Sequence, residues 1–158
     1  MNRLLFILFF ITCIPCCKTI GYTVSYEKKS FTEKSFDSAS VYYEEKNIPQ
    51  KVRNVFKKVS GFKMKLSDSS NFKRIKKRRG EEIRKLLFYV AADGFSIVYY
   101  LHLGRGNHNH CLFFHEYGRG YLSVTSVRLN PKVKSYEDLK ESLVSGNYQL
   151  TERSWCRF

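Results

Sequence analysis

The sequence lacks most of the features that identify a function at once. It holds no catalytic or cofactor motif of useful specificity and no internal repeat. Its apolar run at residues 4–11 is far shorter than the ~20 residues that a helix needs to cross a bilayer, and Pro15 would end a helix there. A permanent transmembrane helix is therefore disfavoured, and function has to be argued from composition, charge and spacing.

Cysteine is also scarce in the body of the chain. Three of the five cysteines precede residue 18, which leaves Cys111 and Cys156. In an oxidising compartment two cysteines make at most one disulfide, and a bridge between them would tie the C-terminal tail to the middle of the domain. The alternative is two separate buried thiols, because the sequence does not give the distance between the two Cα atoms.

The first seventeen residues have the layout of an export signal. An apolar run follows Arg3, and small and polar residues follow the run. Segment 14–17 resembles the lipobox of bacterial lipoproteins, apart from Pro15, and the segment ending at Cys13 is a comparably imperfect match. The resemblance implies a lipid on Cys17 or Cys13, whereas ordinary secretion is the alternative. In both cases we expect an extracytoplasmic protein, either secreted or tethered to a membrane as a lipoprotein.

The remaining length suits one folded domain. Removing residues 1–17 leaves 141 of the 158 residues, enough for a real core but not comfortably for two domains. An apolar fraction of 43%, with eleven Tyr and thirteen Phe against one Trp, argues against disorder. We expect residues 18–46 to form a tether and N-terminal strand region, and residues 47–158 to form the globular domain.

Two helices are predicted from their start and stop signals. Asn47 and Pro49 suit the beginning of the first helix and Gly61 its end, and its apolar residues recur at helical spacing. Ser135 and Asp138 form an approximate capping box that begins the second helix, which runs as far as Gly146.

Alternating patterns predict a series of strands between and around these helices. The long runs are rich in aromatic and β-branched residues and are separated by short breaks with turn residues, at 84–91, 95–103, 110–117 and 121–129. Shorter strands are expected near 22–26, 41–43, 62–66 and 148–158. The fold class is therefore α+β, a single domain with an antiparallel meander of about four to six strands and one or two helices packed on one face.

Basic residues dominate the charge. The chain has 28 Lys and Arg against 14 Asp and Glu, and fifteen of the basic residues but only three of the acidic ones fall in 46–85. Such a patch is typical of surfaces that bind phosphate backbones, anionic glycans or lipid headgroups. The alternative is a solvated basic loop that serves solubility. The candidate anion-binding residues are Lys57, Lys58, Lys63, Lys65, Lys73, Arg74, Lys76, Lys77, Arg78 and Arg79.

The four histidines lie between positions 102 and 115 and admit a metal hypothesis. Imidazole is a common zinc ligand, and His108 and His110 point the same way along an extended chain. His102 is the candidate third ligand, from the neighbouring strand. The alternative is a polar hairpin loop beside packed sheet residues, and we expect no metal or other cofactor.

The same region admits an enzymatic hypothesis. His115 or His102 supplies an acid or base, and Arg105 and Arg119 hold a phosphate as charge develops. A helix followed by a four-stranded meander resembles the layout of small microbial ribonucleases, a likeness of layout without a shared motif.

The preferred interpretation is an exported or surface-tethered, non-enzymatic domain that uses its Lys/Arg-rich surface to bind an anionic polymer, a membrane surface or a protein partner. A secreted metal-independent ribonuclease is one alternative. An inhibitor or immunity-type protein with an aromatic surface patch is the other.

Overall fold

The structure is a computed structural model that describes residues 22–24, 29–60, 65–67, 83–102, 109–117 and 121–150. Residues 1–17, on which the predicted export signal falls, lie outside the described residues, as does the tail at 151–158. In the described part of the chain, no helix is both long and apolar enough to cross a membrane.

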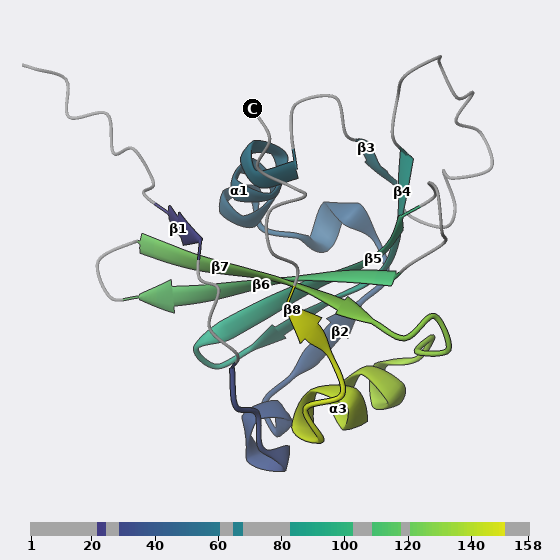
Figure 1. The fold of residues 1–158 in the computed structure, drawn as a ribbon. Coiled ribbons are helices and arrows are strands. Elements are labelled where there is room, and N and C mark those ends of the chain that lie inside the picture. The colour runs from purple at the N-terminus through teal and green to yellow at the C-terminus, as the bar shows by residue number, and fades with distance from the viewer. Residues whose placement is uncertain are drawn as a thin grey trace, which may run out of the picture.

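A four-stranded antiparallel meander forms the centre of the sheet (Figure 1). Its strands are β4 (Ile83–Ala92), β5 (Phe95–His102), β6 (Asn109–Tyr117) and β7 (Tyr121–Leu129). Asp93 and Gly94 join β4 to β5 in a two-residue turn, where Gly94 takes a φ of 78°. Tight hairpin turns of this kind need positive φ, which glycine adopts without steric cost. The four long runs of the sequence pattern are thus confirmed.

Short strands cover the outer edges of the meander, so that the described residues form an eight-stranded sheet. On β7, β1 (Tyr22–Val24) pairs in parallel and β8 (Gln149–Leu150) pairs antiparallel. On β4, β2 (Ser40–Tyr42) pairs antiparallel and β3 (Lys65–Ser67) pairs in parallel. Short edge strands limit the length of backbone that is open to pairing with another chain.

Two α-helices and two short 3₁₀ helices complete the described part of the fold. They are α1 (Gln50–Ser60), α3 (Tyr136–Val144), η1 (Glu33–Phe36) and η2 (Glu45–Asn47). The predicted capping box of α3 is confirmed, since the Asp138 backbone N–H donates to Ser135 Oγ and the Ser135 backbone N–H donates to Asp138 Oδ2, each at 3.1 Å. Gly146, with a φ of 72°, follows the helix at its end.

The sheet separates two hydrophobic cores, one under each helix. Beneath α1, side chains of all four long strands pack with Ile48, Val52, Val55 and Phe56. Beneath α3 and η1, the opposite side chains of the strands pack with Phe36, Leu139 and Leu143. Figure 1 shows α1 above the sheet and α3 below it.

The α+β class, the single domain and the meander with two helices are confirmed, whereas the expectation that the helices share one face is not. A sheet covered on one face predicts strands in which apolar and polar residues alternate, whereas a strand with both faces covered carries apolar residues at successive positions. Val98 faces the α1 core, while its neighbours Ile97 and Tyr99 face the α3 core, and all three are fully buried.

Candidate anion-binding surface

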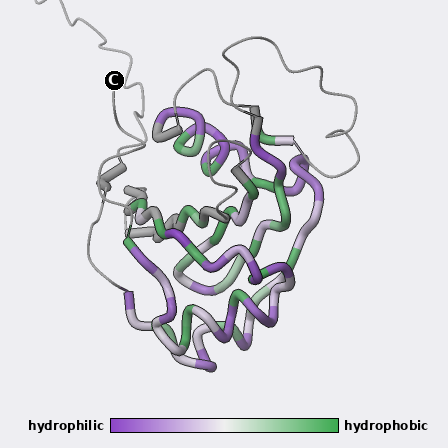
Figure 2. Tube along the Cα trace, turned by 45° about the vertical axis from the view of Figure 1, so that its right-hand side comes forward, coloured by the Kyte–Doolittle hydropathy of each residue, from purple (hydrophilic) through white to green (hydrophobic). Residues whose placement is uncertain are grey.

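α1 combines a buried apolar side with a cationic outer side. Val52, Val55 and Phe56 recur at helical spacing and pack into the core beneath the helix. Figure 2 shows the alternation of hydrophilic and hydrophobic residues along this helix. The burial of one side holds the other side in a fixed orientation toward solvent.

The outer side of α1 carries basic residues without acidic ones. We call Lys51, Arg53, Lys57 and Lys58 the α1 cationic face. Lys57 and Lys58 are exposed, and neither makes an ion pair with any other described residue. Arg53 is partly buried, and its Nε has no hydrogen-bond partner among the described residues. The candidate anion-binding residues predicted from the sequence include Lys57 and Lys58 but omit Lys51 and Arg53.

Helix stability explains part of this arrangement. Lys57 and Lys58 lie in the last turn of α1, where positive charge interacts favourably with the helix dipole. Arg53 and Lys57, however, are four residues apart, and like charges at this spacing destabilise a helix by about 0.2–0.5 kcal/mol. The first turn also lacks an acidic residue. Stability alone therefore does not account for a helix with four cations and no anion.

The rest of the predicted basic patch is described only in part. Lys63 and the run from 73 to 79 (Lys73, Arg74, Lys76, Lys77, Arg78, Arg79) lie outside the described residues. Lys65 begins β3 and pairs by backbone register with Ile83, the first residue of β4. The chain therefore leaves β3 after Ser67 and re-enters at Ile83 on the same sheet edge. Figure 1 places β3 and the start of β4 at the end of the molecule that α1 occupies.

Arg84 belongs to the basic stretch of the sequence but not to the surface. Its side chain is fully buried, its Nη1 donates a 3.0 Å hydrogen bond to Tyr100 Oη, and its Cζ lies 4.8 Å from the centre of that ring. The Tyr100 ring in turn packs edge-on against Phe56 of α1, with centroids 5.4 Å apart. Arg84 therefore supports the packing of Tyr100 against α1. In the sequence, a charged residue at an inward-facing position of the alternating strand pattern could have indicated this buried role.

The backbone register bears on the metal hypothesis. His110 on β6 pairs with Tyr100 on β5, and His102 lies two residues beyond Tyr100, so the two histidines occupy diagonal positions on neighbouring strands. His108 lies outside the described residues. Among the described residues, no group of three or more His, Cys, Asp and Glu side chains could hold a metal ion.

The register separates the residues of the enzymatic hypothesis. His115 pairs with Phe95, which lies seven residues from His102 along β5, or about 23 Å at 3.3 Å per residue. Arg105 and Arg119 lie outside the described residues, in the connections at opposite ends of β6.

Cys111 is fully buried in the core beneath α3 and forms no disulfide with any other described residue. Burial raises the pKa of the thiol well above its usual value, so the group stays protonated at neutral pH. Cys156 lies outside the described residues. The burial of Cys111 agrees with the alternative of a separate buried thiol, while the Cys111–Cys156 bridge stays an untested prediction.

Comparison with known proteins adds no relative. No protein-family model matches the chain, and no curated protein or solved structure matches it significantly. The case for a function therefore rests on the geometry of the molecule itself.

Proposed function

We propose that the protein is an exported, non-enzymatic binding domain whose α1 cationic face attracts an anionic partner. The observation that carries the proposal is a helix with four basic residues and no acidic one, of which Lys57 and Lys58 are exposed and without an ion pair among the described residues. A net charge of +14 adds a long-range attraction for anions.

The binding mechanism is electrostatic. Lysines on a fixed helix present ammonium groups that replace the counterions of a phosphate- or sulfate-bearing partner, and the release of those counterions favours binding. The apolar side of α1 sets the direction of these groups, because Val52, Val55 and Phe56 are held in the core. Such a surface gives affinity and rapid encounter, with little discrimination between polymers of similar charge density.

Export is part of the proposal. It is supported by the charge, apolar run and small residues of segment 1–17, read from the sequence. Lipidation at Cys17 or Cys13 gives a tethered protein, and cleavage without lipidation gives a secreted one.

A salt titration of paired variants tests the proposal. We expect the Lys57→Gln/Lys58→Gln protein to bind a single-stranded oligonucleotide more weakly than the natural protein at low salt. The slope of log affinity against log salt should also fall in magnitude by about 1.4, since each lost phosphate contact on a single strand removes about 0.7. Fluorescence anisotropy over a salt series measures both quantities, and heparin serves as a second polyanion.

The matched control is Lys132→Gln/Lys134→Gln, which removes two exposed lysines next to α3 and changes the net charge equally. It should retain the affinity and slope of the natural protein to within the small effect of net charge. Equal losses in the two variants, or affinity that does not depend on salt, would contradict the proposal.

One observation favours a second candidate, an inhibitor or immunity-type protein. Tyr42 and Tyr43 are 37% and 63% exposed, and they are the exposed large hydrophobic residues of the described part of the chain. Tyr42 stacks on Tyr89 of β4, with ring centroids 6.1 Å apart, so it is held in place at the sheet edge. Exposed tyrosines are common anchors in protein interfaces. Co-purification of a protein that is lost with Tyr43→Ala, but kept with Lys57→Gln/Lys58→Gln, would support this candidate.

A further inference from the structure

The proposed function leaves the class of anionic partner open, and this inference rests on it. We infer that the partner is an anionic membrane surface and that α1 faces it, because the chain enters the fold at the end of the molecule that carries the α1 cationic face.

The first step is the position of the chain's entry. β1 begins at Tyr22, and its last residue, Val24, pairs with Val124 of β7. The Val124 side chain belongs to the core beneath α1 rather than to the core beneath α3. Figure 1 shows β1 toward the end of the molecule where α1 lies, with α3 at the opposite end.

The second step is the reach of the preceding segment. Tyr22 lies five positions after Cys17 and nine positions after Cys13, which corresponds to at most about 18 Å and 32 Å of extended chain. A lipid on Cys17 would therefore hold Tyr22 within about 18 Å of the bilayer, a little more than two Debye lengths at physiological salt. A short tether at this end brings α1 toward the headgroups and keeps α3 away.

The third step is the distribution of charge between the two ends. α1 carries four cations and no anion, whereas α3 carries Glu137, Asp138 and Glu141 against Lys140. An anionic leaflet attracts α1 more strongly than the α3 end, where the exposed Lys132 and Lys134 offset the acidic charge of the helix. The same orientation thus follows from the charges as from the chain entry.

The fourth step favours lipid headgroups over a single-stranded nucleic acid. Sites for single strands combine positive charge with aromatic side chains on which bases stack. The aromatic residue of α1 is Phe56, which is buried, and the exposed aromatics among the described residues lie at the edge formed by β2. Among the described residues, α1 therefore offers charge without an exposed aromatic side chain, and charge alone is sufficient for attraction to an anionic headgroup layer.

Lysine footprinting on vesicles tests the inference directly. The full chain is mixed with vesicles of phosphatidylcholine alone, or with about one third phosphatidylserine, and treated with a water-soluble acetylating reagent. We expect acetylation of Lys57 and Lys58 to slow several-fold on the anionic vesicles, while Lys132 and Lys134 keep their rates. Mass spectrometry reads all four sites in one sample.

Vesicle sedimentation of the paired variants measures the strength of the effect. A basic residue near an anionic leaflet contributes about one kilocalorie per mole, so Lys57→Gln/Lys58→Gln should weaken binding by about 30-fold. Lys132→Gln/Lys134→Gln should bind like the natural protein. The apolar run at 4–11 is present in every variant, so the difference between them reports on α1.

The outcomes separate this inference from the proposed function. Protection of Lys57 and Lys58 by anionic vesicles supports both. Protection by heparin or the oligonucleotide but not by vesicles would overturn the membrane inference and leave the proposed function standing. Protection by none of these probes would overturn both. Equal protection of all four lysines on vesicles would overturn the orientation.

Discussion

The two α-helices of the described chain differ in the interactions that stabilise them. α3 has a capping box, acidic residues in its first turn and an ion pair with η1. α1 has no acidic residue in its first turn and four cations along its length. Both helices bury leucine, valine or aromatic side chains against the same sheet, from opposite faces.

The comparison indicates which helix is organised for stability and which for a partner. In α3, the Lys134 and Ser135 backbone N–H groups donate to the Asp138 carboxylate and hold its pKa below the usual value. These contacts satisfy backbone donors that begin the helix. α1 carries like charges along its outer side, and its exposed Lys57 and Lys58 make no ion pair with any other described residue. A surface that costs some stability in this way is expected where an external anion supplies the balance.

Loss of core packing beneath α3 should have the largest effect on stability. Leu139 is fully buried, so Leu139→Ala should lower the free energy of unfolding by about 2–5 kcal/mol. Urea denaturation followed by circular dichroism measures the change. If the two helices have separate roles, the folded fraction of this variant keeps the anion affinity of the natural protein.

The counterpart of this test is Lys57→Gln/Lys58→Gln, which should lose affinity and retain most of its stability. A Leu139→Ala protein that is folded but binds anions as weakly as the lysine variant would break the distinction between the two ends. A lysine variant as unstable as Leu139→Ala would also contradict the distinction, because Lys57 and Lys58 would then contribute to stability as the α3 core does.

An acidic residue in the first turn of α1 should make the protein more stable and its binding of anions weaker. Gln50 begins the helix, and its side chain donates a 2.8 Å hydrogen bond to Asn54 Oδ1. Gln50→Glu places a negative charge at the positive end of the helix dipole, which should stabilise the protein by about 0.3–1 kcal/mol. The same charge should weaken anion binding. Thermal denaturation and anisotropy measure the two effects, and stronger binding by the more stable variant would argue against an electrostatic surface.

Much of the fold could be predicted from local signals. The Asp93–Gly94 turn, the capping box of Ser135 and Asp138, and the apolar stripe of α1 each specify structure within a few residues. The structure places these elements within one or two residues of their predicted limits. Local chemistry fixes such features, because turns and caps depend on neighbouring residues.

The non-local features could not be predicted in the same way. β1 and β3 pair in parallel with strands distant in the sequence, and no local signal specifies such partners. The opposite placement of the helices depends on which residues of β4 face each side. The register shift between Leu86 and Phe88 changes that alternation within the strand.

The same distinction between local and non-local features applies to the candidate site. Helical spacing was sufficient to place Lys57 and Lys58 on the outer side of α1, where the structure has them. Arg84 counted equally toward the basic stretch of the sequence, but the register turns it inward beneath α1. Charge counts alone do not distinguish a surface cation from a buried one, because that depends on tertiary contacts.

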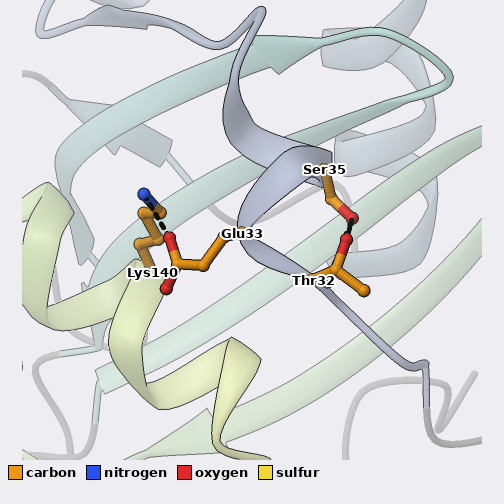
Figure 3. Close-up of polar contacts among 4 residues, drawn as sticks. All are labelled: Thr32, Glu33, Ser35 and Lys140. Carbon is orange, nitrogen blue, oxygen red and sulfur yellow. Dashed lines mark hydrogen bonds and ion pairs between the residues drawn. The ribbon is translucent and has the colours of Figure 1, made fainter.

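The ion pair between η1 and α3 should have the smallest effect. Glu33 Oε2 lies 2.5 Å from Lys140 Nζ, beside the hydrogen bond that joins the side chains of Thr32 and Ser35 (Figure 3). The hydrogen bond to Glu33 raises the pKa of Lys140 above its usual value. A raised pKa means that the contribution of the ion pair to stability is complete below the unfolded-state pKa of Lys140 and is lost as the pH rises through its folded-state pKa.

In Glu33→Gln, we expect the Lys140 pKa to move back toward its usual value, and NMR titration of the side chain measures this shift. The stability difference from the natural protein should be slight at neutral pH, because the pair is partly exposed, and should vanish in strong base. An unchanged Lys140 pKa would show that Glu33 does not hold this lysine, and the polar contact between η1 and α3 would then no longer distinguish the α3 end from α1.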